Sequence, residues 1–107
     1  MGLDNFWISP ETNEPVSLPE LDDLNLTQGL LGDGGSSAFR GKVYNSTVEL
    51  ITGESLYQET IPNATVVKMA EKLSAAVETH RVYADVDKLA QMFTAHAAAG
   101  HDLVGWW

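Results

Sequence analysis

Apolar side chains recur at helical spacing in three stretches of this chain. The first stretch ends before Gly53 and places on one face Phe39, Val43, Tyr44, Thr47, Val48 and Ile51. The second begins at Ile61-Pro62-Asn63, continues to about His80 and carries Val66, Met69, Ala70, Leu73 and Val77. The third opens at Asp85, stops at Gly100 and carries Val86, Leu89, Ala90, Phe93 and Ala97. Because a period near 3.6 residues is typical of amphipathic helices, the pattern predicts three main helices.

The two ends of the chain have strand composition instead. Phe6-Trp7-Ile8 predicts a short strand, and the turn-prone residues after it predict a return at Pro15-Val16. The segment Asp102–Trp107 ends on two large apolar rings, so we expect it to pair with the Phe6 region rather than remain free. Ser17 to Glu20 has the spacing of a capping box and predicts a short helix over Leu18–Leu24. The predicted fold is α+β, with three main helices packed on a small antiparallel sheet formed near the two termini.

Composition limits the class of protein. The 107 residues are 44% hydrophobic and suit one domain, residues 1–107. Cysteine is absent, which excludes disulfides and thiolate metal sites. The start has neither a basic segment nor a long apolar run, so we expect no signal peptide or membrane span and a cytoplasmic protein.

The net charge of -9 is unevenly distributed along the chain. The first 25 residues contain no Lys or Arg and contribute six carboxylates, namely Asp4, Glu11, Glu14, Glu20, Asp22 and Asp23. Direct binding to a nucleic-acid backbone is disfavoured, because such proteins cluster basic side chains. The acidic quarter is either a solvated surface that keeps the protein soluble or a face that docks on a basic partner.

A glycine-rich run followed by a helix start is the strongest candidate site. Backbone N–H groups at a helix N-terminus have no partner within the helix and favour anions. Ser36 or Ser37 is the expected N-cap, and Gly41 inside the helix indicates the close approach of another backbone or a ligand. An aromatic side chain nearby is able to cover a base. The predicted ligand-binding residues are Gly34, Gly35, Ser36, Ser37, Arg40, Lys42, Tyr44 and Tyr57.

Standard nucleotide motifs do not fit this run. Five residues separate Gly35 from Gly41-Lys42 where a Walker A motif requires four, and the third glycine of a dinucleotide fingerprint is replaced by Ser37. Asp33 also places a like charge near any phosphate.

Catalytic and metal sites have little support in the sequence. His96 and His101 are five residues apart, which is not the spacing of two ligands on one helix face, so we expect partly exposed histidines and no metal site. No nucleophile elbow surrounds Ser36 or Ser37. We therefore assign no catalytic residue and no cofactor, and favour a non-enzymatic role.

Three segments resemble short uncharacterised proteins of prokaryotes and their phages. They are the start Met1-Gly2-Leu3-Asp4-Asn5, the segment from Gly35 to Tyr44, and Ser55-Leu56-Tyr57-Gln58-Glu59. The resemblance covers mainly the first two thirds of the chain. It implies a compact stand-alone protein and permits a viral origin, and it transfers no activity or site.

The main functional hypothesis is a small binding protein that holds or sequesters a phosphate-bearing ligand, such as a nucleotide or cyclic nucleotide signal. The alternative is an acidic inhibitor or adaptor, for example a host-defence antagonist, that docks on a basic protein surface. A third hypothesis is a structural subunit that forms a homo-oligomer through Trp106 and Trp107.

Overall fold

The computed structural model describes residues 2–21, 24, 38–79 and 85–107. Within these residues the chain forms a four-stranded antiparallel sheet and three α-helices, which confirms the α+β prediction. The elements are β1 (Asp4–Ile8), the 3-10 turn η1 (Pro19–Leu21), β2 (Ala38–Phe39), α1 (Gly41–Thr52), β3 (Thr60–Ile61), α2 (Asn63–Ala76), α3 (Val86–Ala98) and β4 (Asp102–Trp106).

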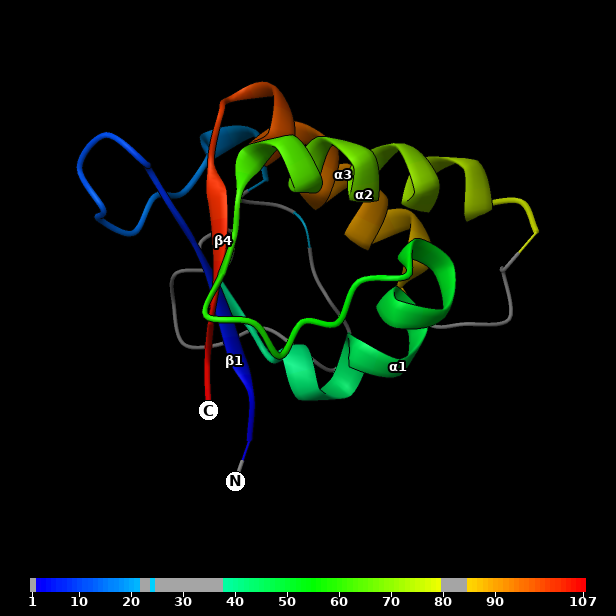
Figure 1. The fold of residues 1–107 in the computed structure, drawn as a ribbon. Helices are drawn as coiled ribbons and strands as arrows, with labels where there is room; N and C mark the ends of the chain where they lie inside the picture. Colours follow the sequence, from blue (N-terminus) through cyan, green and yellow to red (C-terminus); the bar gives the residue numbers. More distant parts are fainter. Residues whose placement is uncertain (1, 22–23, 25–37, 80–84) are drawn as a thin grey trace.

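The sheet has the strand order β2-β1-β4-β3, so the first and last strands of the chain form its centre. Their register runs from Asp4 opposite Trp106 to Ile8 opposite Asp102, which confirms the predicted pairing of the two ends. The return after β1 is also confirmed, because the Val16 amide donates to the Trp7 carbonyl at 2.9 Å. As a result β1 begins and β4 ends at the same end of the sheet (Figure 1).

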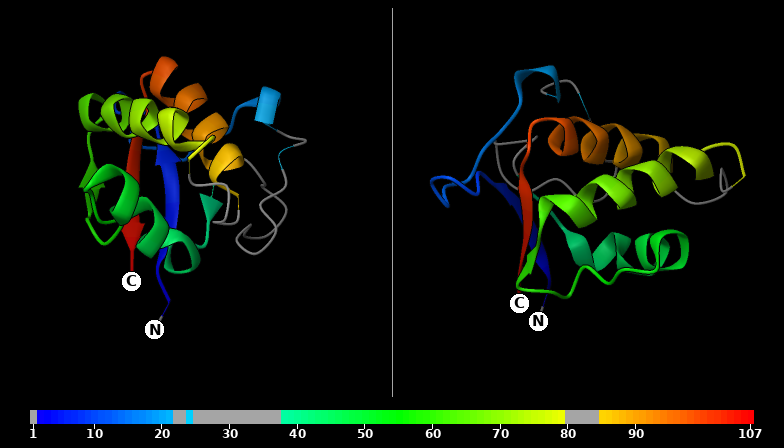
Figure 2. Two further views of the ribbon diagram at one scale, coloured as in Figure 1. Left: turned by 90° about the vertical axis from the view of Figure 1, so that its right-hand side faces the viewer. Right: turned by 45° about the horizontal axis from the view of Figure 1, so that its top comes forward.

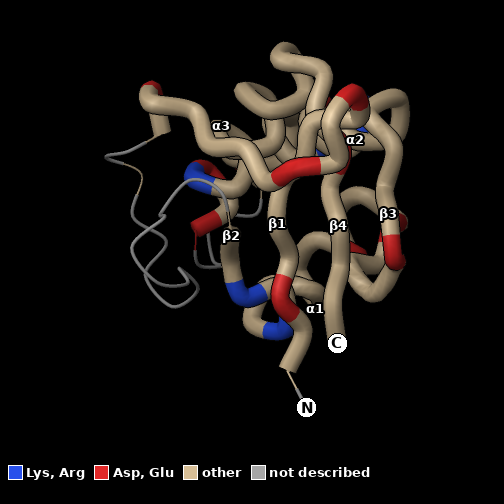
Figure 3. Tube along the Cα trace, turned by 90° about the vertical axis from the view of Figure 1, so that its left-hand side faces the viewer, with Lys and Arg blue, Asp and Glu red and all other residues tan. Residues whose placement is uncertain are grey.

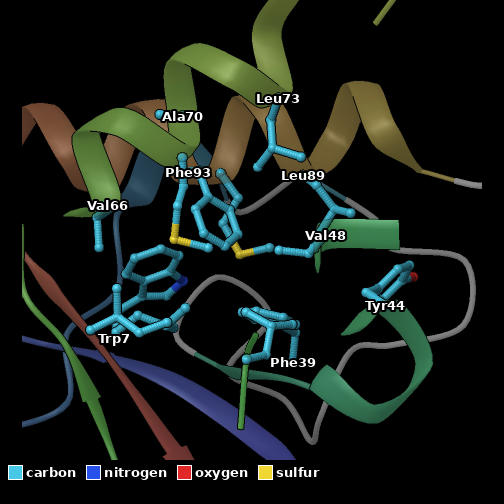
Figure 4. Packing of buried hydrophobic residues seen from close by; sticks show 14 of the residues in the cluster. Trp7, Phe39, Tyr44, Val48, Val66, Ala70, Leu73, Leu89 and Phe93 are labelled. Carbon is cyan, nitrogen blue, oxygen red and sulfur yellow. The ribbon is translucent and has the colours of Figure 1, made fainter. Parts of the chain in front are cut away.

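The helices cover one face of the sheet, and α2 and α3 pack side by side above α1 (Figures 1 and 2). Asn5 and Trp7 of β1, and Leu3 just before it, are fully enclosed. The Trp7 ring makes an edge-on contact with Phe93 of α3 at 5.0 Å between centroids. Figure 4 shows Trp7, Phe93 and the neighbouring apolar side chains meeting between the sheet and the helices. Burial of these large side chains is the main stabilising term of the fold.

Three boundaries differ from the sequence prediction. The first helix begins at Gly41, with Arg40 and not Ser36 or Ser37 at the N-cap, because Ala38–Phe39 is a strand that pairs with β1. Pairing satisfies the backbone hydrogen-bonding groups at the edge of β1 and buries the Phe39 ring completely. For this reason Phe39 lies in a strand, although its spacing fits the helix that follows. The predicted short helix is the three-residue turn η1 in the described residues, and α2 ends at Ala76, before the predicted end at about His80.

Candidate functional site

The start of α1 is packed against the buried side chain of Asn5. A Cβ atom added at Gly41 would lie 1.6 Å from the Asn5 Oδ1 and 3.0 Å from the Leu3 Cδ2, so only glycine fits there. The sequence predicted the close approach of another backbone or a ligand at this glycine; the approach is close, but the group that approaches is a side chain of the same protein. The Asn5 Oδ1 makes no hydrogen bond within the described residues. It lies beside the positive end of the α1 dipole, which favours a partial negative charge at this position.

Asn5 also connects the start of α1 to the segment that carries Tyr57. Its Nδ2 donates to the carbonyl oxygens of Leu56 at 3.3 Å and Val104 at 3.2 Å. One amide group therefore touches α1, β4 and the connector between α1 and β3. This contact fixes the connector beside the helix start, at the end of the sheet where β1 begins and β4 ends.

The backbone amides at the start of α1 are partly used by the protein itself. The Lys42 amide donates to the Leu3 carbonyl at 3.2 Å, and the Val43 amide donates to the Arg40 carbonyl at 3.1 Å. An anion at this end therefore depends on side chains more than on free backbone donors.

The side chains of Arg40 and Lys42 are exposed and line a shallow pocket of about 380 Å³. Its other lining residues are Gly2, Leu3, Asp4 and Val43. Figure 3 shows the basic segments at the end of β2 and the start of α1 next to an acidic segment at the start of β1. We call the six residues around this pocket the basic end. Two of the six Lys and Arg residues of an acidic chain are gathered there.

Aromatic rings are exposed near the basic end. Tyr57 is 40% exposed, Trp106 72% and Trp107 51%, and the Tyr57 and Trp107 rings contact edge-on at 5.6 Å between centroids. The connector reaches β4 at Gly105, where an added Cβ would meet the carbonyl oxygens of Gln58 at 2.5 Å and Leu56 at 2.8 Å. The prediction that Tyr57 is accessible to a ligand is consistent with this exposure.

Tyr44 does not belong to this surface. Its side chain is 2% exposed, and its hydroxyl donates to the Asp85 Oδ2 at 2.5 Å, ahead of α3. The ring belongs to the core and lies 6.4 Å from the Phe39 ring between centroids, so Tyr44 is not available to stack on a base (Figure 4). Tyr44 lies on the apolar face of α1, where helical spacing predicts a core position. This spacing, and not its nearness to Arg40 and Lys42 in the sequence, decides where the side chain lies. Gly34, Gly35, Ser36 and Ser37 lie outside the described residues.

His96 is more buried than the sequence predicted, whereas His101 is partly exposed, as expected. His96 is fully enclosed, and its ring stacks on Trp7 with centroids 4.3 Å apart and planes 4° apart. The Nδ1 atoms of His96 and His101 lie 2.8 Å apart, at hydrogen-bond distance. Burial lowers the pKa of His101, and the nearby Asp102 carboxylate offsets this in part. Sequence spacing missed the pair because Gly100, with a φ of +82°, reverses the chain and brings His101 back onto the end of α3.

Metal ligands are not gathered anywhere in the described part of the chain. No group of three His, Cys, Asp or Glu side chains there is arranged to hold an ion. None of the described helices is long and apolar enough to cross a bilayer. Comparison of the chain with family models, with curated proteins and with solved structures finds no match in any of the three.

Proposed function

We propose that this protein binds a small phosphate-bearing ligand, such as a nucleotide or cyclic nucleotide, at the basic end and does not turn it over. One observation carries the proposal: Arg40 and Lys42 flank a pocket at the same end of the sheet as the exposed rings of Tyr57 and Trp107. Charged donors for a phosphate beside rings that stack on a base are the two components of nucleotide recognition.

Each side chain has a distinct role in this proposal. The Arg40 guanidinium binds two phosphate oxygens in a fork, and Lys42 adds a compact positive charge. Tyr57 and Trp107 cover the base. Asp4 lines the same pocket and repels phosphate, so a ligand of low charge, such as a cyclic nucleotide with one negative charge per phosphate, is favoured over a triphosphate.

The test is calorimetry against a panel of mononucleotides, cyclic nucleotides and triphosphates. Arg40→Ala is expected to weaken binding about tenfold or more, because a charge-assisted hydrogen bond contributes roughly 1.5–3 kcal/mol. Lys68→Ala is the matched control, since Lys68 is an exposed basic residue of α2 outside the pocket. A panel without any binding, or binding that Arg40→Ala leaves intact, would refute the proposal.

A second candidate function is docking on a basic protein in the cytoplasm, as an inhibitor or adaptor, for example a phage-encoded antagonist. The described part of the acidic N-terminal quarter favours it, because Glu11, Glu14 and Glu20 are all exposed there. Asp22 and Asp23 lie outside the described residues. Capture of a partner at low salt that is lost at high salt is the expected result, since exposed charges are screened.

Self-association through the terminal rings is a third candidate, favoured by the exposure of Trp106 and Trp107. Light scattering on a chain truncated after Gly105 tests it: an oligomer of the full chain that the truncation abolishes is the expected result.

A further inference from the structure

The outer surface of the α2–α3 helix pair, on the side away from β1, is hollowed into a groove. Its larger part has a volume of about 840 Å³ and is bounded at one end by η1. A smaller hollow of about 340 Å³ shares Ser74, Thr94 and Ala98 with it, so the two hollows adjoin and together form a depression along the helix pair. We call this depression the α2–α3 groove. It is separate from the basic end, with which it has no lining residue in common.

Small side chains create the concavity. Besides the larger apolar side chains of Leu21, Val67 and Val77, the lining contains many small residues, namely Ala70, Ser74, Ala90, Thr94, Ala95, Ala97 and Ala98. Such residues let α2 and α3 approach closely and leave space above the line where the two helices meet. The Ser74 and Thr94 hydroxyls, one from each helix, lie 3.4 Å apart across this line.

Carboxylates surround these small residues. Glu20 and Asp87 line the larger part and Glu71 lines the smaller part, all three exposed, and Glu78 also lines the groove. No Lys or Arg contributes to the lining in the described residues. The Lys72 ammonium donates instead to the Thr52 carbonyl at the end of α1, and the Lys88 ammonium lies 3.7 Å from an Asp85 oxygen.

We propose that the α2–α3 groove docks a basic amphipathic helix of a partner protein. A groove between two helices with many small residues in its lining accepts the apolar ridge of a third helix, and the carboxylates on its borders meet Lys or Arg on the flanks of that ridge. The molecule measures 37 × 29 × 27 Å, so a helix of about 18 residues, ~27 Å long, matches its width. This inference rests on the second candidate function and gives it a surface and a class of partner.

The experiment measures binding of a fluorescent helical peptide to the full chain by anisotropy. The peptide has about 18 residues, with Ala and Leu on one face and Lys on the flanks. The groove variant is Glu20→Lys/Glu71→Lys, which reverses one charge in each part of the groove. The control variant is Glu11→Lys/Glu14→Lys, which makes the same change in net charge on the loop after β1, away from the groove. A third variant, Ala98→Trp, fills the groove from an exposed position. Circular dichroism checks that each variant is folded.

We expect the full chain to bind the peptide and the groove variant to bind it about tenfold or more weakly. Ala98→Trp is expected to weaken binding without a change in charge. The control variant is expected to change the affinity less than about twofold. Equal loss in the groove and control variants would mean attraction to overall charge and would overturn the groove. Absence of peptide binding would overturn it as well. The unsubstituted chain could instead form an oligomer that Ala98→Trp does not form. That result would place a second copy of the chain in the groove and overturn the assignment to a basic helix.

The test is independent of nucleotide binding. Arg40→Ala is expected to leave peptide binding unchanged, so a failure at the basic end does not affect the groove. The Glu20→Lys/Glu71→Lys variant could still capture a partner in a salt-sensitive way while the Glu11→Lys/Glu14→Lys variant does not. In that case docking on a basic protein would stand, but its surface would be the loop after β1. This outcome would overturn the groove alone.

Discussion

Replacement of Gly41 by alanine is predicted to destabilise this protein, against the usual effect of this change in a helix. Alanine at a helical position is normally more stable than glycine by up to about 1 kcal/mol. Here the new Cβ would lie 1.6 Å from the Asn5 Oδ1 and 2.9 Å from its Cγ, so the Asn5 side chain has to leave its position.

The magnitude follows from what Asn5 does in the fold. Its two hydrogen bonds, to the Leu56 and Val104 carbonyls, contribute roughly 1 kcal/mol each. Forcing an extra methyl group into a packed site costs a further ~1–3 kcal/mol. After subtraction of the helix-propensity gain, Gly41→Ala is expected to reduce the free energy of unfolding by about 2–4 kcal/mol.

Urea unfolding, followed by circular dichroism and tryptophan fluorescence, measures this difference. Gly2→Ala is the matched control, because an added Cβ at Gly2 meets nothing within 4 Å and is expected to leave stability unchanged. In an Asn5→Ala background, Gly41→Ala is expected to cost much less, since the Asn5 oxygen is gone and only the contact with the Leu3 Cδ2 at 3.0 Å remains. A Gly41→Ala protein as stable as the wild type, or an equal cost with and without Asn5, would show that the reasoning is wrong.

Three further substitutions or conditions test the packing. Gly105→Ala is expected to lower the free energy of unfolding in urea by about 2 kcal/mol or more, because the new Cβ meets two backbone carbonyl oxygens at 2.5 and 2.8 Å. Backbone oxygens move less readily than a side chain. Unchanged stability would contradict the close approach. Tyr44→Phe is expected to cost about 2 kcal/mol through loss of the hydrogen bond to Asp85, with little change in circular dichroism, and an unchanged urea midpoint would argue against that bond. Burial lowers the pKa of His101 below its unfolded value of 6.5, so the folded state binds fewer protons than the unfolded state. The free energy of unfolding is therefore highest above about pH 6.5 and falls as the pH drops toward the lowered pKa. A lower urea midpoint at about pH 5.5 than at about pH 7.5, with a smaller difference in His101→Asn, is the expected result. Equal midpoints would contradict the lowered pKa of His101.

The elements that formed where the sequence predicted them are those with a complete local pattern. Between Val66 and Leu73, and again between Val86 and Phe93, apolar residues recur over whole helical turns, and these periods alone place α2 and α3. The strand composition of Asp102–Trp106 predicted β4, and its unprotected apolar end predicted the pairing with β1.

The start of α1 shows where local pattern is insufficient. Phe39 fits both the helical face that follows it and a two-residue strand, and only the presence of β1 alongside decides between them. The capping propensity of Ser36 and Ser37 acts over a few residues, whereas pairing with Asn5 and Phe6 is a contact between segments more than 30 positions apart.

By itself, the sequence determined the class of fold, the three main helices, the pairing of the two chain ends and the expectation of a close approach at Gly41. The tertiary structure alone decided that this contact is Asn5, that Val43 and Tyr57 are exposed, and that His96 is buried against Trp7. The physical reason is range: periodicity and turn chemistry are properties of neighbouring residues. The partner of a buried polar group or of a glycine depends on which distant segments the folded chain brings together.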